Sequence, residues 1–540
     1  MSPQSGASKG PSLATQVSGA VLWNTLFVPL KMLLVLLATL LKLTVLSKAS
    51  YGMLTLIGAA NNLFGTWIDL GTGRALPKFI PETLQAAGPK AMRRLVFLVL
   101  GAQMALLTIV ALGSILLREA YFDYLRVQAG KVPDLAAREH LLLFIDQRGP
   151  LIILAVLIML LMGIGYDVLM AYLSSFFKQK AWNAVALAAG LLPPLLTSVA
   201  ILAGWDVAGV LLATTVAPCI VTALAAWQVL KHQRELEALT QPPDTGQWLP
   251  AGFIRYSAVS LLMTATDFLA SAEFVVFFVE GLIAAAIMKA GVSIVKMMLD
   301  YLYTPMVGVQ VPLFTRVRAG EGGTLNGAYQ SIVRLQLLLL IPGGIGLMLL
   351  ARSVFGILFP NYVEATALVW VLVPCLFLEC LLTTAHNVLI VYEHLTIIII
   401  SRVLTLVSVP LVLFLTPQFG LIGAALAFGL ARVLAGLWVT SSGVRLLGLR
   451  WPWKFSLRVL AASLAMAALV ASLASFLPQL STSATISERL LGLPGLAGVA
   501  LVGGSAFLMA LRFLGGLEPQ DREQLLRTRL PMKRWISKII

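Results

Sequence analysis

Charged side chains inside long apolar stretches are the residues of this sequence whose types and positions best suit chemistry. They comprise four acids and five bases, namely Asp267, Glu273, Asp300, Glu379, Lys31, Lys289, Lys296, Arg402 and Arg432. Fixed cations in an apolar medium can bind an anionic group, and carboxylates there can balance charge or carry protons. These residues therefore predict a site that handles a charged molecule or ion.

Motifs for other chemistry do not occur in the sequence. It contains no G-x-x-x-x-G-K-[ST] loop for ATP phosphates, no H-E-x-x-H zinc motif and no C-x-x-C pair. The three cysteines, Cys219, Cys375 and Cys380, are odd in number and lie in apolar runs, which favours neither a disulfide framework nor a metal site. We expect no cofactor, no metal and no enzymatic activity.

The spacing of the charges allows two interpretations. Lys289 and Lys296 are seven residues apart and share one face of a predicted helix, and Asp300 follows Lys296 by four. Glu273 and Glu280 share a face of the preceding helix in the same way. One interpretation is a cationic strip beside an acidic strip, both lining a polar central cavity. The other is a set of ion pairs, Lys296 with Asp300 and Lys289 with Glu273 or Glu280, that holds the two helices together.

The free-energy cost of a charge in the hydrocarbon means that these side chains must pair with one another or line a cavity that contains water. Each deep charge costs roughly 3 kcal/mol on insertion scales, so nine approach roughly 25 kcal/mol, above the roughly 5–15 kcal/mol of net stability of a typical fold. Arg402 lies about two turns from a predicted helix end, and we expect it to snorkel to the interface. The remaining candidates divide into substrate-binding cations (Lys31, Lys289, Lys296, Arg432) and coupling or charge-balancing acids (Asp267, Glu273, Asp300, Glu379).

The composition indicates that these charged residues belong to a membrane protein. The chain has 540 residues, of which 59% are hydrophobic and 12% are charged, whereas soluble proteins carry about 25% charged residues. This excludes a water-soluble enzyme built on one core. The net charge of +15 is typical of a membrane protein with basic cytoplasmic loops, and we do not expect nucleic acid as a partner.

The apolar runs predict an all-α polytopic protein of about fourteen transmembrane helices. Only Glu280-Gly281 separates the seventh from the eighth helix, and Pro305 and Pro312 are expected to break the eighth below Asp300. The predicted helices lie near 17–41, 51–73, 95–117, 149–173, 183–203, 207–230, 254–280, 282–312, 329–351, 365–390, 396–416, 420–443, 456–477 and 491–513.

The distribution of Lys and Arg predicts the orientation. With the N-terminus inside, the cytoplasmic segments hold 25 Lys and Arg residues, and the opposite side holds nine, five of them in one loop, 118–148. Basic residues accumulate on the cytoplasmic side of membrane proteins. We therefore expect a protein of the cytoplasmic membrane with both termini inside.

A short internal repeat predicts two lobes. V-A-G-V-L-L-A (Val207–Ala213) and L-I-G-A-A-L-A (Leu421–Ala427) both begin the sixth helix of a six-helix unit, and parallel repeats of this size are a common transporter plan. The predicted parts are a cytoplasmic N-terminal tail (1–16), an N-lobe of helices 1–6 (17–230), a cytoplasmic linker (231–253), a C-lobe of helices 7–12 (254–443), helices 13–14 (444–513) and a basic cytoplasmic tail (514–540). This tail is either a surface segment attracted to anionic membrane lipids or a disordered, solvated segment.

Four segments resemble the polysaccharide transporter family. They read S-K-A-S-Y-G-M-L-T-L (Ser47–Leu56), W-I-D-L-G-T-G-R-A-L-P-K-F-I-P-E (Trp67–Glu82), F-G-I-L-F-P-N-Y-V-E-A-T (Phe355–Thr366) and F-G-L-I-G-A-A-L-A (Phe419–Ala427). That family comprises the Wzx-type oligosaccharide flippases of the MOP exporter superfamily, which are related to MATE exporters and to the lipid II flippase. In helix count and spacing the resemblance covers nearly the whole chain. It assigns no individual site residue.

The resemblance implies two six-helix lobes plus two C-terminal helices, and the flipping of undecaprenyl-diphosphate-linked oligosaccharide for surface polysaccharides such as lipopolysaccharide. The charges suit that substrate. We expect alternating access of the lobes around a central charged cavity, with Lys296 and Lys31 binding the diphosphate and Asp267 or Glu273 balancing charge or carrying protons. Glycosyltransferases and the polymerase of the same pathway are candidate partners.

Two alternatives stay open. A MATE-like exporter of organic cations would use acids in helices 1, 2, 7 or 8, and Asp267 and Glu273 are compatible with it. A membrane glycan polymerase or ligase is less expected, because such enzymes usually have a large outer loop with catalytic Arg or His. The longest outer loop predicted for this chain, 118–148, is short by comparison.

Overall fold

Helices make up all the regular structure of the described chain. The computed structural model describes residues 33–176, 179–237, 249–320, 323–478 and 485–515, and no strand occurs in these ranges. A chain that crosses lipid must satisfy its backbone hydrogen bonds internally, which a helix does. The predicted all-α fold class is confirmed.

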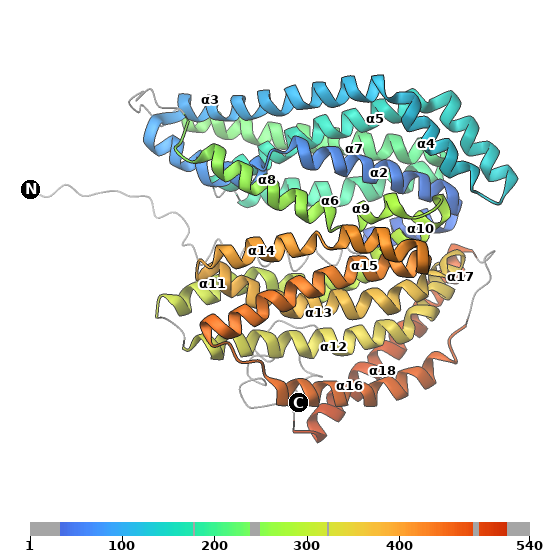
Figure 1. Ribbon diagram of the computed structural model, residues 1–540. Coiled ribbons are helices and arrows are strands. Elements are labelled where there is room, and N and C mark those ends of the chain that lie inside the picture. Colours follow the sequence, from blue (N-terminus) through green and yellow to red (C-terminus); the bar gives the residue numbers. More distant parts are fainter. Residues whose placement is uncertain (1–32, 177–178, 238–248, 321–322, 479–484, 516–540) are drawn as a thin grey trace, which may run out of the picture. The chain divides into compact units, whose positions relative to one another are not determined.

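The helices follow one another with short connections (Figure 1). A helix Leu33–Val45 comes first. The others are α2 (Lys48–Ile68), α3 (Thr72–Leu116), α4 (Arg118–Gly130), α5 (Leu135–Ser175), α6 (Gln179–Leu202), α7 (Asp206–Glu237), α8 (Phe253–Leu269), α9 (Ala272–Val275), η1 (Val276–Phe278), α10 (Leu282–Leu302), α11 (Thr304–Arg318), α12 (Leu325–Leu358), η2 (Pro360–Tyr362), α13 (Ala365–Val391), α14 (Leu395–Thr405), α15 (Ser408–Leu447), α16 (Trp453–Ala474), α17 (Ile486–Leu491) and α18 (Leu493–Phe513).

The described helices are long and apolar enough for a multi-pass membrane protein. Ten candidate spans qualify, or eleven if the bent pair α8 and α9–η1 is one span. The expected number of fourteen is not confirmed by this count. Two of the ten, Lys48–Leu116 and Leu395–Leu447, have 69 and 53 residues, far more than the roughly 20 residues that one crossing needs. They bend at Gly88 and Gly420, which have non-helical backbone angles.

Three predicted elements can be compared with the structure directly. The expected seventh helix, 254–280, is divided into α8 and α9–η1 by a bend of 53°. The predicted outer loop 118–148 is largely helical, formed by α4 and the first turns of α5. The eighth helix is broken at Pro305 as expected: α10 ends at Leu302, and Pro305 lies in the first turn of α11, where a missing N–H costs no hydrogen bond. The expected break at Pro312 is wrong, because α11 continues through that position to Arg318.

The chain divides into two compact units that do not follow the sequence order strictly. One comprises Met1–Leu46, Ala60–Arg126 and His140–Thr264, and the other comprises Ser47–Ala59, Val127–Glu139 and Ala265–Ile540. The predicted domain boundaries remain a prediction. In the first unit, a core of buried apolar side chains from α3, α5, α6, α7 and α8 includes Phe79, Tyr172 and Phe253.

In the second unit, α13 packs between α12 and α15. Small residues allow the close approach: Gly344 of α12 faces Phe377, and Gly429 and Gly436 of α15 face Cys375 and Leu382 of α13. Glycine and other small residues let helices in membranes approach until their backbones nearly touch. The packing fixes the rotation of α13 and α15, and therefore the direction of their charged side chains.

Two of the sequence motifs meet within the second unit although they are far apart in the sequence. The Nζ of Lys48 lies 2.8 Å from the Glu364 carboxylate, and the rings of Tyr51 and Tyr362 pack edge to face with centroids 6.2 Å apart. Gly52 lies against the backbone of α10, where a Cβ atom would be 1.8 Å from the carbonyl oxygen of Leu282. These motif residues join helices.

The motif Trp67–Glu82 has a comparable structural role in the first unit. Asp69 begins the turn after α2, and its carboxylate accepts a hydrogen bond from the Gly73 N–H at 3.1 Å, at the start of α3. Gly71 has a φ of +69°, and a Cβ atom there would lie 2.3 Å from the Ser257 carbonyl oxygen. Phe79 packs on Phe253 with centroids 5.4 Å apart.

Candidate functional site

The break between α8 and α9 is the centre of the candidate site. The last helical residue of α8 is Leu269, and the side chain of Ser271 accepts a hydrogen bond from the Phe274 N–H at 3.3 Å, which caps α9. A serine oxygen at this position satisfies one of the N–H groups that a helix start leaves without a partner. The sequence has neither proline nor glycine at the break, so a continuous helix was expected here.

Side chains of α15 satisfy the carbonyl groups that the break exposes. The hydroxyl of Ser408 donates to the Leu269 carbonyl at 3.3 Å, and Nε of Arg432 donates to the Ala270 carbonyl at 3.2 Å. Carbonyl groups at a helix end have no partner in their own helix, and a dry environment makes that costly. The bend is therefore supported by the tertiary structure.

Arg432 also links the break to α13. Its Nη1 donates to Oε1 of Glu379 at 2.7 Å, and its guanidinium lies over the Phe428 ring at 4.9 Å. Both side chains of the pair are about a quarter exposed. With its charge balanced by Glu379 and one face covered by an aromatic ring, Arg432 is well placed to hold the backbone of Ala270.

Arg402 of α14 pairs with Asp267, two residues before the end of α8. Its guanidinium donates a hydrogen bond to the Asp267 carboxylate. The Asp267 carboxylate thus gives Arg402 a partner within the protein, and the expected snorkelling of Arg402 to the interface stays a prediction. His386 of α13 lies within electrostatic range of both groups.

On the other side of the break, Glu273 lies beside two lysines of α10. Its carboxylate is 3.2 Å from Nζ of Lys289 and 3.9 Å from Nζ of Lys296. The spacing of seven residues places both lysines on the face that meets α9, as expected for an α-helix. The exposed fraction of the side chain is 19% for Glu273, 35% for Lys289 and 50% for Lys296.

The break thus brings together most of the residues that the sequence singled out. Asp267, Glu273, Glu379, Lys289, Lys296 and Arg432 all take part in ion pairs at or next to it, together with Arg402. Asp300 lies near the end of α10 and is exposed. Lys31 lies outside the described residues. The arrangement can hold an anion on Lys296, whose ammonium is beyond hydrogen-bond distance of Glu273.

Polar contacts continue along α13 within the same unit. The hydroxyl of Thr384 donates to the Gln336 side chain at 2.7 Å, and both side chains are fully buried. The Asn387 amide donates to Gln310 at 2.7 Å. Hydrogen bonds between buried side chains of this kind specify how membrane helices pack.

Two residues of the site were missed by the sequence analysis. Ser271 and Ser408 are small polar residues in apolar runs, and their types alone do not distinguish them from other serines. A serine followed by an acidic first turn, as in Ser271-Ala272-Glu273, is a helix-start signal and could have indicated the break. Within the described residues, no group of three or more His, Cys, Asp or Glu side chains could hold a metal ion.

Comparison with solved structures finds two proteins of similar fold. The lipid II flippase MurJ, in an inward closed conformation, matches with a TM-score of 0.64 and 13% identity over 91% of this chain and all of the flippase chain. An inward-facing multidrug resistance MATE transporter of the MOP superfamily matches with a TM-score of 0.55 and 13% identity, over 77% of this chain and 94% of the transporter. This chain shares its fold with these two proteins.

Sequence comparisons give no further assignment. No protein-family model matches the chain, and no curated protein sequence matches it. Because so few residues are identical, the likeness to the two transporters is one of fold. The substrate must therefore be argued from the residues of this chain.

Proposed function

We propose that this protein is a flippase that moves undecaprenyl-diphosphate-linked oligosaccharide across the cytoplasmic membrane for surface polysaccharide biosynthesis. The observation that carries the proposal is the pair Lys289 and Lys296, two cations on one face of a membrane helix that share the single carboxylate of Glu273. The fold shared with the lipid II flippase over 91% of the chain supports it.

The chemistry of these residues suits a diphosphate. A lysine ammonium binds phosphate as a point charge with three donors, and hydrogen bonds between charged groups are the strong ones. Lys296 is half exposed and lies 3.9 Å from Glu273, so it can exchange the carboxylate for a phosphate oxygen at little cost. Lys289 keeps the closer contact with Glu273 and would hold the carboxylate in place. In this proposal Lys31 supplies a second cation for the substrate.

The other charges would set and transmit the conformation. Arg432 and Glu379 hold the break between α8 and α9, and Asp267 pairs with Arg402 just before it. If Glu273 or Asp267 exchanged its present ion-pair partner for another, the contacts that hold the bend between α8 and α9 would change. Substrate binding would in this way be linked to movement of the bent helix. Asp267 or Glu273 would carry coupling protons, Asp300 would balance charge near the end of α10, and the lobes would alternate in access.

The test is a flipping assay on purified full-length protein in proteoliposomes. The probe is undecaprenyl diphosphate bearing a fluorescent oligosaccharide, whose transfer between leaflets is followed by an impermeant quencher. Lys296→Ala should abolish most of the transfer, and Lys296→Arg should retain part of it because the charge is kept. Arg118→Ala, an exposed cation in α4, is the matched control. Transfer by Lys296→Ala at the wild-type rate would refute the assignment.

A MATE-like exporter is the second candidate, favoured by the carboxylates of Asp267 and Glu273 beside a bent helix and by the MATE fold. Efflux of a cationic dye from the same proteoliposomes, lost in Glu273→Gln and unaffected by the lipid-linked sugar, would support it over flipping. Joining of glycans by the purified protein in detergent would instead indicate a polymerase or ligase.

The proposed setting follows from the same function. A flippase for this substrate acts in the cytoplasmic membrane, with both termini inside according to the charge distribution. Glycosyltransferases that build the oligosaccharide and the polymerase that extends it are the proposed partners.

A further inference from the structure

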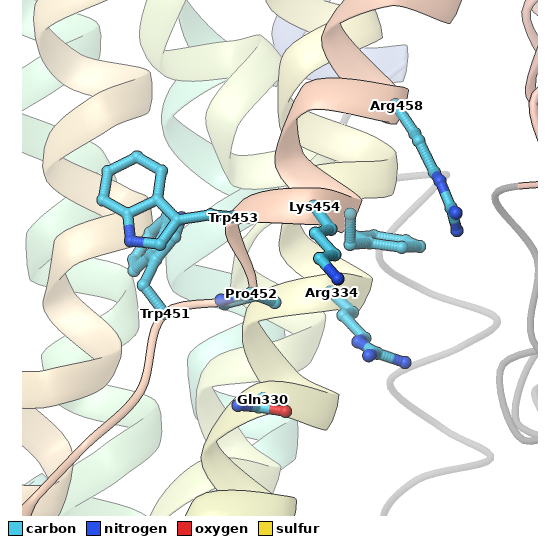
Figure 2. A pocket seen from close by; sticks show the side chains of 8 residues that line it. Gln330, Arg334, Trp451, Pro452, Trp453, Lys454 and Arg458 are labelled. Atoms are coloured by element: carbon cyan, nitrogen blue, oxygen red, sulfur yellow. The ribbon is translucent and has the colours of Figure 1, made fainter.

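A basic pocket lies where α12 and α16 begin, on residues that take no part in the candidate site. Its volume is about 380 Å³, and its lining includes the side chains of Arg334, Lys454 and Arg458 and of two tryptophans, Trp451 and Trp453. The lining residues, all within the described chain, include no Asp or Glu. Figure 2 shows the three cations on one side of the first turns of α16 and the two indoles on the other.

Hydrogen bonds between α12 and the segment before α16 shape this pocket. The Asn326 side chain donates to the Gly448 carbonyl at 2.9 Å and accepts from the Arg450 N–H at 2.8 Å. One turn further along α12, Gln330 donates to the Arg450 carbonyl at 3.1 Å. The indole N–H of Trp451 donates to the Ser456 hydroxyl at 2.9 Å. Side-chain hydrogen bonds thus hold the wall of the pocket in place.

The three cations differ in how firmly they are held. The Arg334 guanidinium lies over the Phe455 ring at 5.3 Å, and Nη1 of Arg458 donates to the Gly515 carbonyl at 2.9 Å. Lys454 lies in the first turn of α16 and is exposed. The start of a helix also carries a partial positive charge. The positive charge gathered on this wall makes it a site for an anion, with the exposed Lys454 and Arg458 as its main contacts.

An apolar stripe on α16 continues from the pocket. Trp453, Leu457, Leu460 and Leu464 are 70%, 64%, 41% and 59% exposed, and their spacing places them on one face of the helix. Because α16 is one of the membrane-span candidates, this face is available to acyl chains. Tryptophan is enriched at the level of the lipid headgroups, so Trp451 and Trp453 mark the boundary between the pocket and the hydrocarbon.

We propose that this pocket binds the phosphate of an anionic membrane lipid, with the acyl chains along the exposed stripe of α16. Basic pockets at the ends of membrane helices bind anionic headgroups in this way. A free phosphate would use the same three cations and would leave the stripe unused. The adjoining apolar stripe is the reason for choosing the lipid. The lipid is a ligand of the folded protein, separate from any substrate of Lys289 and Lys296.

The test is a binding titration on delipidated, full-length protein in detergent, followed by native mass spectrometry. The probes are phosphatidylglycerol, phosphatidylcholine and inorganic phosphate. We expect phosphatidylglycerol to bind at least about tenfold more tightly than phosphatidylcholine, and Lys454→Gln/Arg458→Gln to reduce that preference about tenfold. Lys454 and Arg458 are both exposed, so the double variant should fold. Arg334 is left unchanged because its replacement by Gln could prevent folding.

The control variant removes two exposed cations elsewhere, Arg316→Gln/Arg352→Gln, and should bind phosphatidylglycerol like the wild type. A second variant, Leu457→Gln/Leu460→Gln, should weaken lipid binding if acyl chains follow the stripe. Equal affinity for both lipids, or an unchanged preference in the Lys454→Gln/Arg458→Gln variant, would overturn the proposal. So would inorganic phosphate that competes fully with the lipid at equal concentration, which would indicate a free-phosphate site.

Discussion

Arg432 donates a hydrogen bond to the carbonyl oxygen of Ala270, in the break between α8 and α9, and a second one to Glu379 of α13. One guanidinium on α15 therefore connects two other helical segments. It can do so because its planar group carries several donors in fixed directions. A charge inside the membrane region here supports a bend in a neighbouring helix, a role for which the sequence alone gave no indication.

Removal of this guanidinium should destabilise the protein more than removal of an exposed one. Arg432→Ala leaves the Ala270 carbonyl and the Glu379 carboxylate without their partner, which we expect to cost about 2–3 kcal/mol. Arg432→Lys should recover part of the loss, because an ammonium can reach Glu379 but cannot reproduce both bonds. Melting temperatures in detergent measure this, with Arg352→Ala as the control. A midpoint for Arg432→Ala equal to that of Arg352→Ala would contradict the role given to Arg432.

The hydroxyl of Ser408 should have a smaller effect of the same kind. Ser408→Ala removes the donor to the Leu269 carbonyl and should lower the free energy of unfolding by about 1 kcal/mol. Ser441 is a matched control on the same helix, because its hydroxyl donates only along its own helix, to the Trp438 carbonyl. Ser441→Ala should leave the melting temperature unchanged. If Ser408→Ala and Ser441→Ala have the same melting temperature, Ser408 does not support the break.

The contact between α2 and α10 should tolerate no side chain at Gly52. A Cβ atom there would lie 1.8 Å from the Leu282 carbonyl oxygen, whereas one at Gly58 of the same helix would meet nothing within 4 Å. We expect Gly52→Ala to lose about 1–3 kcal/mol through the displaced backbone, and Gly58→Ala to be neutral or slightly stabilising, since alanine favours helix. Thermal unfolding in detergent compares them. Equal stability of the two variants would mean that the helices pack differently.

The predicted orientation can be tested with single cysteines. In a background with Cys219, Cys375 and Cys380 changed to alanine, Glu119→Cys should react with an impermeant maleimide on intact cells. Thr245→Cys, in the predicted cytoplasmic linker, should react only after permeabilisation. The expectation follows from the excess of Lys and Arg in the predicted cytoplasmic segments. The reverse pattern of labelling would show that the protein has the opposite orientation in the membrane.

The class of molecule follows from the amino-acid sequence alone. Apolar composition and run length are local properties that add up along the chain, so they indicate a helical membrane protein without any knowledge of contacts. Charges such as Glu273 and Lys289 stood out for the same reason, since each has an energetic cost in lipid wherever it lies. The spacing of Lys289 and Lys296 also predicted correctly that they share a helix face.

Which charged side chains meet depends on how the helices pack in three dimensions. Whether Lys289 pairs with Glu273 or Glu280 depends on how α10 is rotated against α9. The pair of Arg402 and Asp267 joins residues that are 135 positions apart in the sequence. The break after Leu269 exists because Ser408 and Arg432, which are distant in the sequence, satisfy its carbonyl groups. Such partners come from helix packing between distant segments, which hydropathy and local spacing do not encode.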